Sequence, residues 1–152
     1  MTPPFRCVVD TSVGIKQFIP DPLSPKVNQL FAHLANPRTD FFVPDLFYIE
    51  CANTLWKYVR AGRYDATEVQ ADLASLRALP LRVISTSELV MDAVSIGLTY
   101  GISAYDACYV ALSQQVSAPL LTVDGKLLRD LAAASYNIHL FNDFPIPPLP
   151  SL

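Results

Sequence analysis

The sequence predicts an α/β fold in which helices cover both faces of a mostly parallel sheet of about five strands. Two observations predict this architecture. Short apolar runs of β-rich composition alternate along the chain with longer segments of helical periodicity. The apolar runs are also nearly continuous, which is typical of strands that are buried on both faces. No repeat or linker interrupts the 152 residues, so we expect a single domain.

The first half of the chain is expected to contain two strands and four helices. The run FRCVV is apolar and too short for a helix, so it is predicted to be a buried strand. Pro20 and Pro22 stop the helix that follows, Ser24 and Pro25 start the next one, and Gly62 ends the long one. The predicted order is strand 5–9, helices 11–19 and 24–35, strand 41–43, and helices 45–61 and 65–78.

The second half repeats this alternation and closes on a last strand. LRVIS and PLLTV are apolar β-rich runs, and serine or threonine residues are placed to cap the two helices between them. GKLLRDLAAA has a helical composition, and NIHLF is again a short apolar run. The predicted order is strand 81–85, helices 87–101 and 103–115, strand 119–123, helix 125–134 and strand 137–141.

The predicted elements define a folded domain of residues 1–143, followed by a tail of residues 144–152. The tail, FPIPPLPSL, is rich in proline. Proline favours an extended backbone, and chain ends are often poorly ordered. We therefore expect an extended or disordered end rather than an arm docked on the domain.

Composition excludes several classes of protein. The chain is 51% hydrophobic and only 16% charged, which argues against disorder. No apolar run reaches the roughly 18 to 20 residues that a bilayer requires, and MTPPFRCVVD is too short and polar for a signal peptide. Cys7, Cys51 and Cys108 lie far apart in apolar segments and are expected to be buried free thiols. These features predict a cytoplasmic protein that does not enter a membrane.

Two acidic residues follow predicted strands directly. Asp10 ends CVVD and Asp124 ends LLTVD, and each precedes a predicted helix. In open α/β sheets, ligands bind at the carboxyl ends of the strands, so both acids are expected at that edge. Either residue could instead cap the following helix, and Asp124 with Gly125 could form a simple turn.

Two further acids lie on predicted helices. Asp106 belongs to ISAYDACYVAL, which is apolar on nearly every side and is expected to be buried; its spacing from Ser103 also suits a capping box. Glu50 shares a polar stripe with Asn53, Thr54 and Lys57, which could equally be a solvated face. If the four acids meet, they would repel one another unless a divalent cation binds. Metal-bound water is a nucleophile for phosphodiester cleavage. The net charge of −3 is unusual for a nucleic-acid-binding protein, and a bound cation would offset it locally.

The segments VVDTSV, IECANTL, SAYDACYVAL and LLTVD occur in this order between residues 6 and 141. As an ordered set they resemble the PIN-domain nucleases, in particular the VapC-like toxins of bacterial and archaeal toxin–antitoxin pairs. The resemblance implies a three-layer α/β/α sandwich and cleavage of single-stranded or structured RNA with Mg²⁺ or Mn²⁺. It also implies a homodimer that a small antitoxin protein neutralises.

The resemblance also implies roles for individual residues. Asp10 and Asp106 match the principal metal-binding acids, Asp124 matches the acid that completes the cluster, and Glu50 matches the helix-borne glutamate. Supporting positions match Thr11, Ser12 and Thr122. Candidate phosphate contacts are few, and comprise Lys16, Lys57 and Lys126.

Other chemistry-bearing residues are expected to be structural. Tyr105 and Tyr109 flank Asp106 and could stack on a base, but core packing is expected for both. His33 and His139 show no partner at ligand spacing. The helices at 45–62 and 65–78 carry apolar residues that are expected to be mostly core, with some available for a dimer contact or an antitoxin, namely Leu55, Trp56, Val59, Leu73 and Leu76.

The sequence alone leaves rival functions open. Haloacid-dehalogenase-like phosphatases have a second Asp two residues after the first, and this chain has Ser12 at that position. Receiver domains need paired acids near the end of the first strand, and this chain has no such pair. Both classes are disfavoured. A protein that kept the fold but lost catalysis, binding RNA or protein, stays open. So does a nuclease that works outside any toxin–antitoxin pair.

Overall fold

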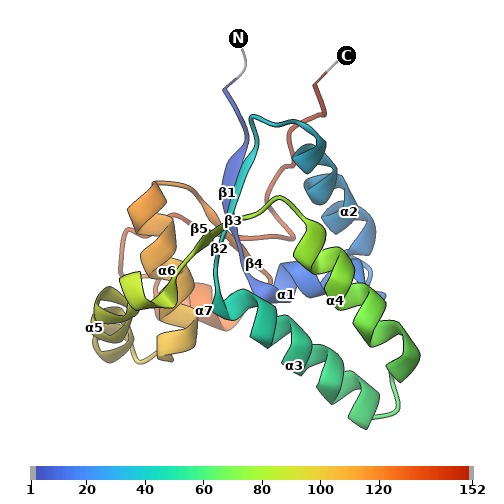
Figure 1. Cartoon of the computed structure of the whole chain (residues 1–152). Helices are drawn as coiled ribbons and strands as arrows, with labels where there is room; N and C mark the ends of the chain where they lie inside the picture. The colour runs from blue at the N-terminus through green and yellow to red at the C-terminus, as the bar shows by residue number, and fades with distance from the viewer. Residues whose placement is uncertain (1–2, 151–152) are drawn as a thin grey trace.

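A central parallel sheet organises the molecule, as the alternation of elements predicted. The computed structural model describes residues 3–150. The strands are β1 (Arg6–Val9), β2 (Asp40–Pro44), β3 (Arg82–Ile84), β4 (Leu120–Thr122) and β5 (Ile138–Leu140). Their order across the sheet is β3–β2–β1–β4–β5, and every neighbouring pair is parallel (Figure 1). The chain moves outward from β1 to β3 and returns to the other side at β4, which creates a switch point between β1 and β4.

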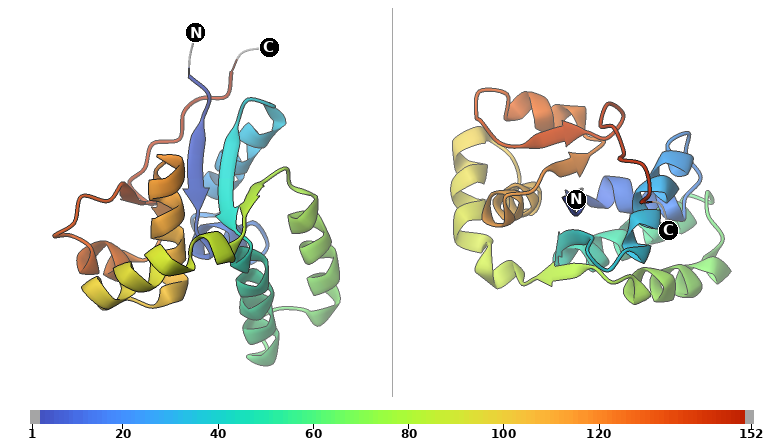
Figure 2. Two further views of the ribbon diagram at one scale, coloured as in Figure 1. Left: turned by 60° about the vertical axis from the view of Figure 1, so that its left-hand side comes forward. Right: turned by 90° about the horizontal axis from the view of Figure 1, so that it is seen from above.

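Helices cover both faces of this sheet and give the expected three-layer sandwich. Figures 1 and 2 show α2 and α4 on one side and α5 and α6 on the other. The connections that carry them are the crossovers that parallel strands require. The helices are α1 (Thr11–Gly14), α2 (Ser24–Ala32), α3 (Leu46–Arg60), α4 (Val69–Ala78), α5 (Val90–Tyr100), α6 (Ala104–Val116) and α7 (Gly125–Asp130).

The hydrophobic core lies between the central strands and α6. Cys7, Val8 and Val9 of β1 and both leucines of β4 are fully buried. Helix α6 is buried continuously from Ala107 to Ser113, which confirms the interpretation of an apolar segment as a central helix. All three cysteines are free and buried, as expected. Among residues 3–150, no helix is both long and apolar enough to cross a membrane.

Some predicted elements differ from the observed ones. The helix expected at 11–19 is only α1 followed by a 3₁₀ turn, Ile15–Gln17. The helix expected at 125–134 stops at Asp130, because exposed alanines have helical propensity but no packing to hold them. Strand β3 is not buried on both faces: it is an edge strand, and Arg82 and Val83 are exposed.

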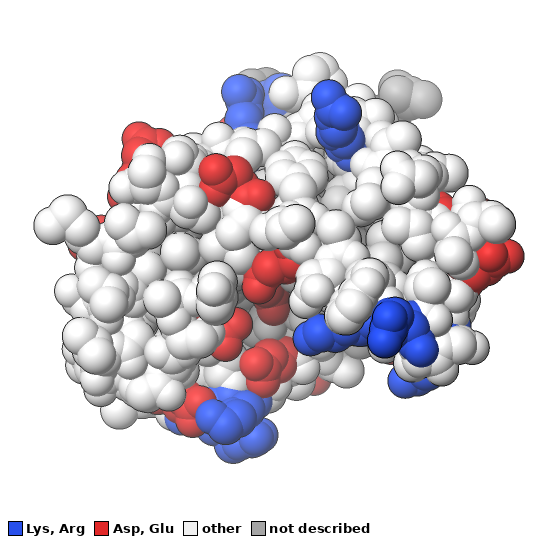
Figure 3. All heavy atoms as spheres, turned by 60° about the horizontal axis from the view of Figure 1, so that its bottom comes forward, with Lys and Arg blue, Asp and Glu red and all other residues white. Residues whose placement is uncertain are grey.

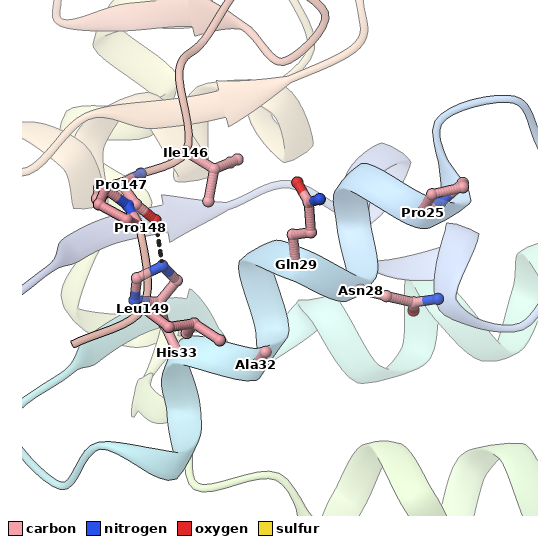
Figure 4. Close-up of a pocket in the computed structure, with 9 residues that line it drawn as sticks. All are labelled: Pro25, Asn28, Gln29, Ala32, His33, Ile146, Pro147, Pro148 and Leu149. Carbon is pink, nitrogen blue, oxygen red and sulfur yellow. Dashed lines mark hydrogen bonds between the residues drawn. The ribbon is translucent and has the colours of Figure 1, made fainter. Parts of the chain in front are cut away.

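The C-terminal tail is docked, although a free end was predicted. Residues 144–150 form no helix or strand, but Phe144 and Ile146 pack against the core. The buried ring of His33, on the turn after α2, makes a 2.8 Å hydrogen bond through Nε2 with the carbonyl oxygen of Pro147 (Figure 4). Apolar contacts and this bond outweigh the tendency of a proline-rich end to stay free. Residues 151 and 152 of the predicted tail lie outside the described part of the chain.

The docked tail lies at the amino edge of the sheet. It runs beside α2 and forms a pocket with Pro25, Gln29 and Ala32. Figure 1 shows both chain ends near this edge, opposite the carboxyl ends of the strands. The histidines have structural partners, as expected, since His139 contacts the Asn137 side chain and the Phe144 ring. The tail therefore leaves the carboxyl edge open.

A close approach between α5 and α6 fixes the start of α6. A Cβ atom added to Gly97 would lie 2.8 Å from the carbonyl oxygen of Ile102, a fixed backbone atom. Gly97→Ala is therefore expected to destabilise the protein by about 1–3 kcal/mol through overpacking. Urea unfolding measures this. Leu98→Ala, at a side chain that is 83% exposed, should stay within about 0.5 kcal/mol of the parent. Equal stability of Gly97→Ala and the parent would contradict the rigid contact.

Candidate active site

Asp10 is fixed at the switch point by hydroxyl groups from two strand ends. It follows β1 directly, and its Oδ2 accepts hydrogen bonds from Ser12 Oγ at 2.7 Å and Thr122 Oγ1 at 2.8 Å. Thr122 ends β4, the neighbouring strand, and is fully buried. Ser12 and Thr122, two of the predicted supporting residues, therefore both contact Asp10. The carboxylate has one orientation and stays partly buried.

Asp124 combines the predicted position with the alternative capping role. Its Oδ1 accepts the backbone N–H groups of Lys126 at 3.0 Å and Leu127 at 3.2 Å, which caps α7. Both bonds use the same oxygen, so the other oxygen is left for a further partner. The capping role and a role in the acidic cluster are compatible.

Asp106 lies in the first turn of α6. Ser103 Oγ accepts the backbone N–H of Asp106 at 3.1 Å, so serine is the cap that the spacing predicted. The Asp106 carboxylate is partly buried and lies near Asp10 and Asp124. Burial is the largest cause of its raised pKa, and the charges of Asp10 and Asp124 raise the pKa further. The start of α6 thus presents this acid to the ends of β1 and β4.

Glu50 is held by two hydroxyl groups, one from Thr11, a supporting position in the sequence analysis, and one from Tyr109, for which the sequence predicted only core packing. Tyr109 donates its hydroxyl to Glu50 Oε1 at 2.6 Å, and Thr11 Oγ1 donates to the same oxygen at 3.1 Å. The two hydroxyl groups are themselves 2.8 Å apart. The group joins α1, the second turn of α3, and α6.

The two tyrosines near Asp106 have opposite environments. Tyr109 is 1% exposed, so core packing is confirmed for its ring, but its hydroxyl reaches the site. Its position three residues after Asp106 on one helix face was the available signal. For Tyr105, core packing was wrong, because its side chain is 67% exposed and lies outside the packed surface of α6.

The four acids form one electrostatic cluster. Burial raises the pKa of Asp10, and the charge of Asp124 raises it further. The hydrogen bonds from Ser12 and Thr122 lower this pKa but do not cancel the rise. Burial also raises the pKa of Glu50, and the charges of Asp10 and Asp106 contribute. Figure 3 shows acidic atoms gathered in a hollow in the face that contains the carboxyl edge. The sheet therefore brings together all four acids predicted from sequence.

The acids are near one another without converging on a single point. Within residues 3–150, no group of three or more His, Cys, Asp or Glu side chains is arranged to hold a metal ion as the side chains stand. The acids are nevertheless close enough for their charges to act on one another: burial is the largest cause of the raised pKa values of Asp10, Glu50 and Asp106, and neighbouring acids add to it.

The three candidate lysines differ in how they are bound. Lys16 donates to the carbonyl oxygen of Ser12 at 2.9 Å and lies 4.0 Å from Asp21, so it is used within the fold. Lys126 forms a 2.7 Å ion pair with Asp130, yet its charge still lowers the pKa of Asp106. Lys57 is exposed on α3, and no ion pair to it is found among the described residues.

Comparison with known proteins agrees with this fold. The family model of the PIN domain matches residues 7–133, and the chain therefore belongs to the PIN-domain family. The match includes Asp10, Glu50, Asp106 and Asp124. Two solved structures share the fold. A toxin–antitoxin complex from Klebsiella pneumoniae aligns with a TM-score of 0.56 at 17% identity, over 88% of this chain and 96% of that one. A crystal structure of a Pyrobaculum aerophilum protein aligns with a TM-score of 0.62 at 22% identity, over 83% and 79%.

Curated relatives place the chain within this family more narrowly. It is 32% identical over 130 residues to a protein of Pyrobaculum aerophilum named ribonuclease VapC3. This alignment covers 84% of this chain and 96% of the relative. A Mycobacterium tuberculosis protein of the same name is also 32% identical, over 128 residues, 84% of this chain and 89% of the relative. The chain is thus similar to VapC-like PIN proteins over nearly their full length.

Removing one charge from the cluster is expected to stabilise the metal-free protein. The folded-state pKa of Asp106 is raised, so the folded protein binds the proton more tightly than the unfolded chain does. This stabilising contribution is present at low pH and is lost as the pH rises above about 4 and through the folded-state pKa. Asp106→Asn should therefore raise the free energy of unfolding at pH 7 and flatten its fall with pH.

Urea unfolding in EDTA across this pH range measures the effect. Asp143→Asn, at an exposed turn residue, is the matched control and should change neither quantity appreciably. A lower stability of Asp106→Asn at pH 7 would show that its carboxylate is compensated in the metal-free protein.

Proposed function

We propose that this protein is a divalent-metal-dependent endoribonuclease that cleaves phosphodiester bonds in single-stranded RNA. One observation carries the proposal: four carboxylates, after β1, on α3, on α6 and after β4, lie near one edge, and burial together with the charge of neighbouring acids raises the pKa values of Asp10, Glu50 and Asp106. Structural acids are normally paired or exposed, and clustered ones with raised pKa values mark functional sites. The ribonuclease names of the relatives support RNA as the substrate.

The donor set fits a hard divalent cation. All candidate ligands are carboxylate oxygens, which Mg²⁺ and Mn²⁺ prefer, and the uncompensated charge favours a cation. Asp10, Asp106 and Asp124 would hold it. When bound, the ion would activate water and stabilise charge on the phosphate.

The protein's own groups would orient the reaction. Tyr109 and Thr11 both occupy Oε1 of Glu50, so Oε2 is the oxygen available to orient the attacking water and accept its proton. The raised pKa of Glu50, caused first by burial, suits a general base better than an ordinary carboxylate. Ser12 and Thr122 keep Asp10 from rotating away from the hollow.

The wider role follows from the relatives. We propose that the enzyme acts in the cytoplasm as the toxin of a toxin–antitoxin pair, forming a homodimer and binding a small antitoxin. A toxin–antitoxin complex among the structures of the same fold supports the partner. Residues 1–143 would carry the activity, with the tail outside the catalytic domain. Lys57 and Lys126 are the better candidates for phosphate contacts, since Lys16 is bonded within the fold.

Metal binding should be detectable without catalysis. Mn²⁺ should raise the melting temperature of the parent, because a ligand that binds only the folded state stabilises it. Asp10→Asn should abolish the shift and lower RNA cleavage by at least about 100-fold, since even indirect partners of a metal contribute 10- to 100-fold. Differential scanning fluorimetry and cleavage of a labelled single-stranded RNA, with and without EDTA, measure both. Cleavage that persists in EDTA would refute the metal mechanism.

Tyr109 should matter for turnover and not for substrate binding. Tyr109→Phe keeps the buried ring but removes one of the two hydroxyl groups that hold Glu50. We expect kcat to fall roughly 10- to 100-fold with KM nearly unchanged. Tyr105→Phe, at the exposed tyrosine of the same helix, is the matched control and should retain activity. A change confined to KM would indicate that Tyr109 does not position Glu50.

A further inference from the structure

An acidic active site repels the phosphates of RNA, so the basic residues that bind RNA must lie outside the acidic cluster. RNA binding depends largely on Lys and Arg contacts to phosphate, whereas the hollow is acidic and its neighbour Lys126 is already paired with Asp130. Most basic residues near other parts of the fold are already engaged. Lys26 donates to the carbonyl oxygen of Phe141, and Arg6 and Arg82 both pair with Asp40 near the amino end of the sheet.

The second half of α3 and the turn after it differ from the rest of the surface. From residue 51 to residue 64 the chain has Lys57, Arg60 and Arg63 and not one Asp or Glu. All three basic residues are exposed, and no ion pair to any of them is found within residues 3–150. This segment therefore carries three positive charges close together that no ion pair among the described residues neutralises.

Aromatic rings accompany these charges. Trp56 is 56% exposed, and the Arg60 guanidinium lies over its ring at 5.6 Å from the centroid. Arg63 lies over the Tyr58 ring at 4.9 Å. An exposed aromatic ring beside phosphate-binding cations is the combination that holds single-stranded nucleic acids, by stacking bases and neutralising the backbone.

The basic segment continues the helix that carries Glu50 and extends away from the candidate active site. Lys57 is seven residues after Glu50, which places both on the same side of α3, about 10 Å apart along the axis. Arg60 follows about 5 Å further. Figure 3 shows basic atoms beside the acidic hollow, on the side toward which α3 extends in Figure 1. A strand bound at Glu50 would meet these residues on leaving the hollow.

We propose that residues 56–63, the α3 track, bind the single-stranded RNA next to the cleavage site. Trp56 stacks on a base, while Lys57, Arg60 and Arg63 contact the phosphates on either side. The proposal rests on the proposed function, because it takes the strand at the acidic cluster as RNA. It assigns to Trp56 a role other than the core or dimer contact that its apolar character suggests. The charge of the segment favours RNA over an apolar protein partner, although Ile49 is also 69% exposed on α3.

The chain offers a specific probe for this proposal. Trp56 is its one tryptophan, so tryptophan fluorescence, excited selectively over that of the seven tyrosines, reports on the α3 track alone. In the full-length Asp10→Asn variant with EDTA, where no cleavage is expected, titration with a single-stranded oligouridine should quench this fluorescence. A duplex of the same length should quench it much less, because its bases are not free to stack. Quenching by neither ligand would overturn the proposal.

Affinity measurements on the same background separate stacking from charge. Fluorescence anisotropy of the labelled oligouridine should show roughly 5- to 150-fold weaker binding for Trp56→Ala. The double variant Lys57→Gln/Arg60→Gln should also bind more weakly, and its log–log salt slope should fall by about 1.4, or 0.7 per lost contact. Arg38→Gln, an exposed arginine at the opposite edge with no ion pair among the described residues, should match the parent.

Two results would overturn the proposal without touching the proposed function. Unchanged affinity of both α3 variants, with cleavage by the parent intact, would place the RNA elsewhere. Dissociation of a dimer by Trp56→Ala in sedimentation, with RNA affinity retained, would show that this face binds a second copy of the chain. Conversely, quenching and variant effects as described, with no metal-dependent cleavage by the parent, would support the track and refute the nuclease.

Discussion

Electrostatic repulsion among four carboxylates at the carboxyl edge of the sheet is the constraint on which the rest of this structure depends. One acid alone at a helix start or strand end would destabilise the folded state little. Together they are partly buried: burial is the largest cause of the raised pKa values of Asp10, Glu50 and Asp106, and the charges of neighbouring acids contribute further. A fold retains such a cluster only if other contacts fix it in place. The fixed contacts are the parallel pairing of β1 with β4 and the buried helix α6.

Hydroxyl groups, rather than basic residues, hold the cluster. Ser12 and Thr122 donate to Asp10, while Thr11 and Tyr109 donate to Glu50. A lysine or arginine in the same places would neutralise the carboxylates and remove the reason for a cation to bind. Hydroxyl donors orient the acids and leave their charge available. This arrangement supports the proposal that a cation from outside the chain binds at these acids.

The two edges of the sheet have separate tasks. The amino edge carries the chain ends, and there His33 and Phe144 fasten the tail. The carboxyl edge carries the acids, and the charge on α3 begins two helical turns from Glu50. A chain with net charge −3 can therefore still carry a local positive surface on α3, as the proposed RNA contact requires. Net charge describes the whole molecule, whereas binding depends on where the charges lie.

The sequence by itself determined the alternation of strands and helices, the burial of α6 and the acids that follow β1 and β4, because hydrophobic periodicity and strand ends are local properties. It also suggested the Ser103 cap from local spacing. Only the tertiary structure decided that Tyr109 reaches Glu50 from 59 residues away, that Tyr105 faces solvent, and that the tail docks. These outcomes depend on which surfaces meet after the chain crosses the sheet. Local propensity carries no information about such long-range contacts.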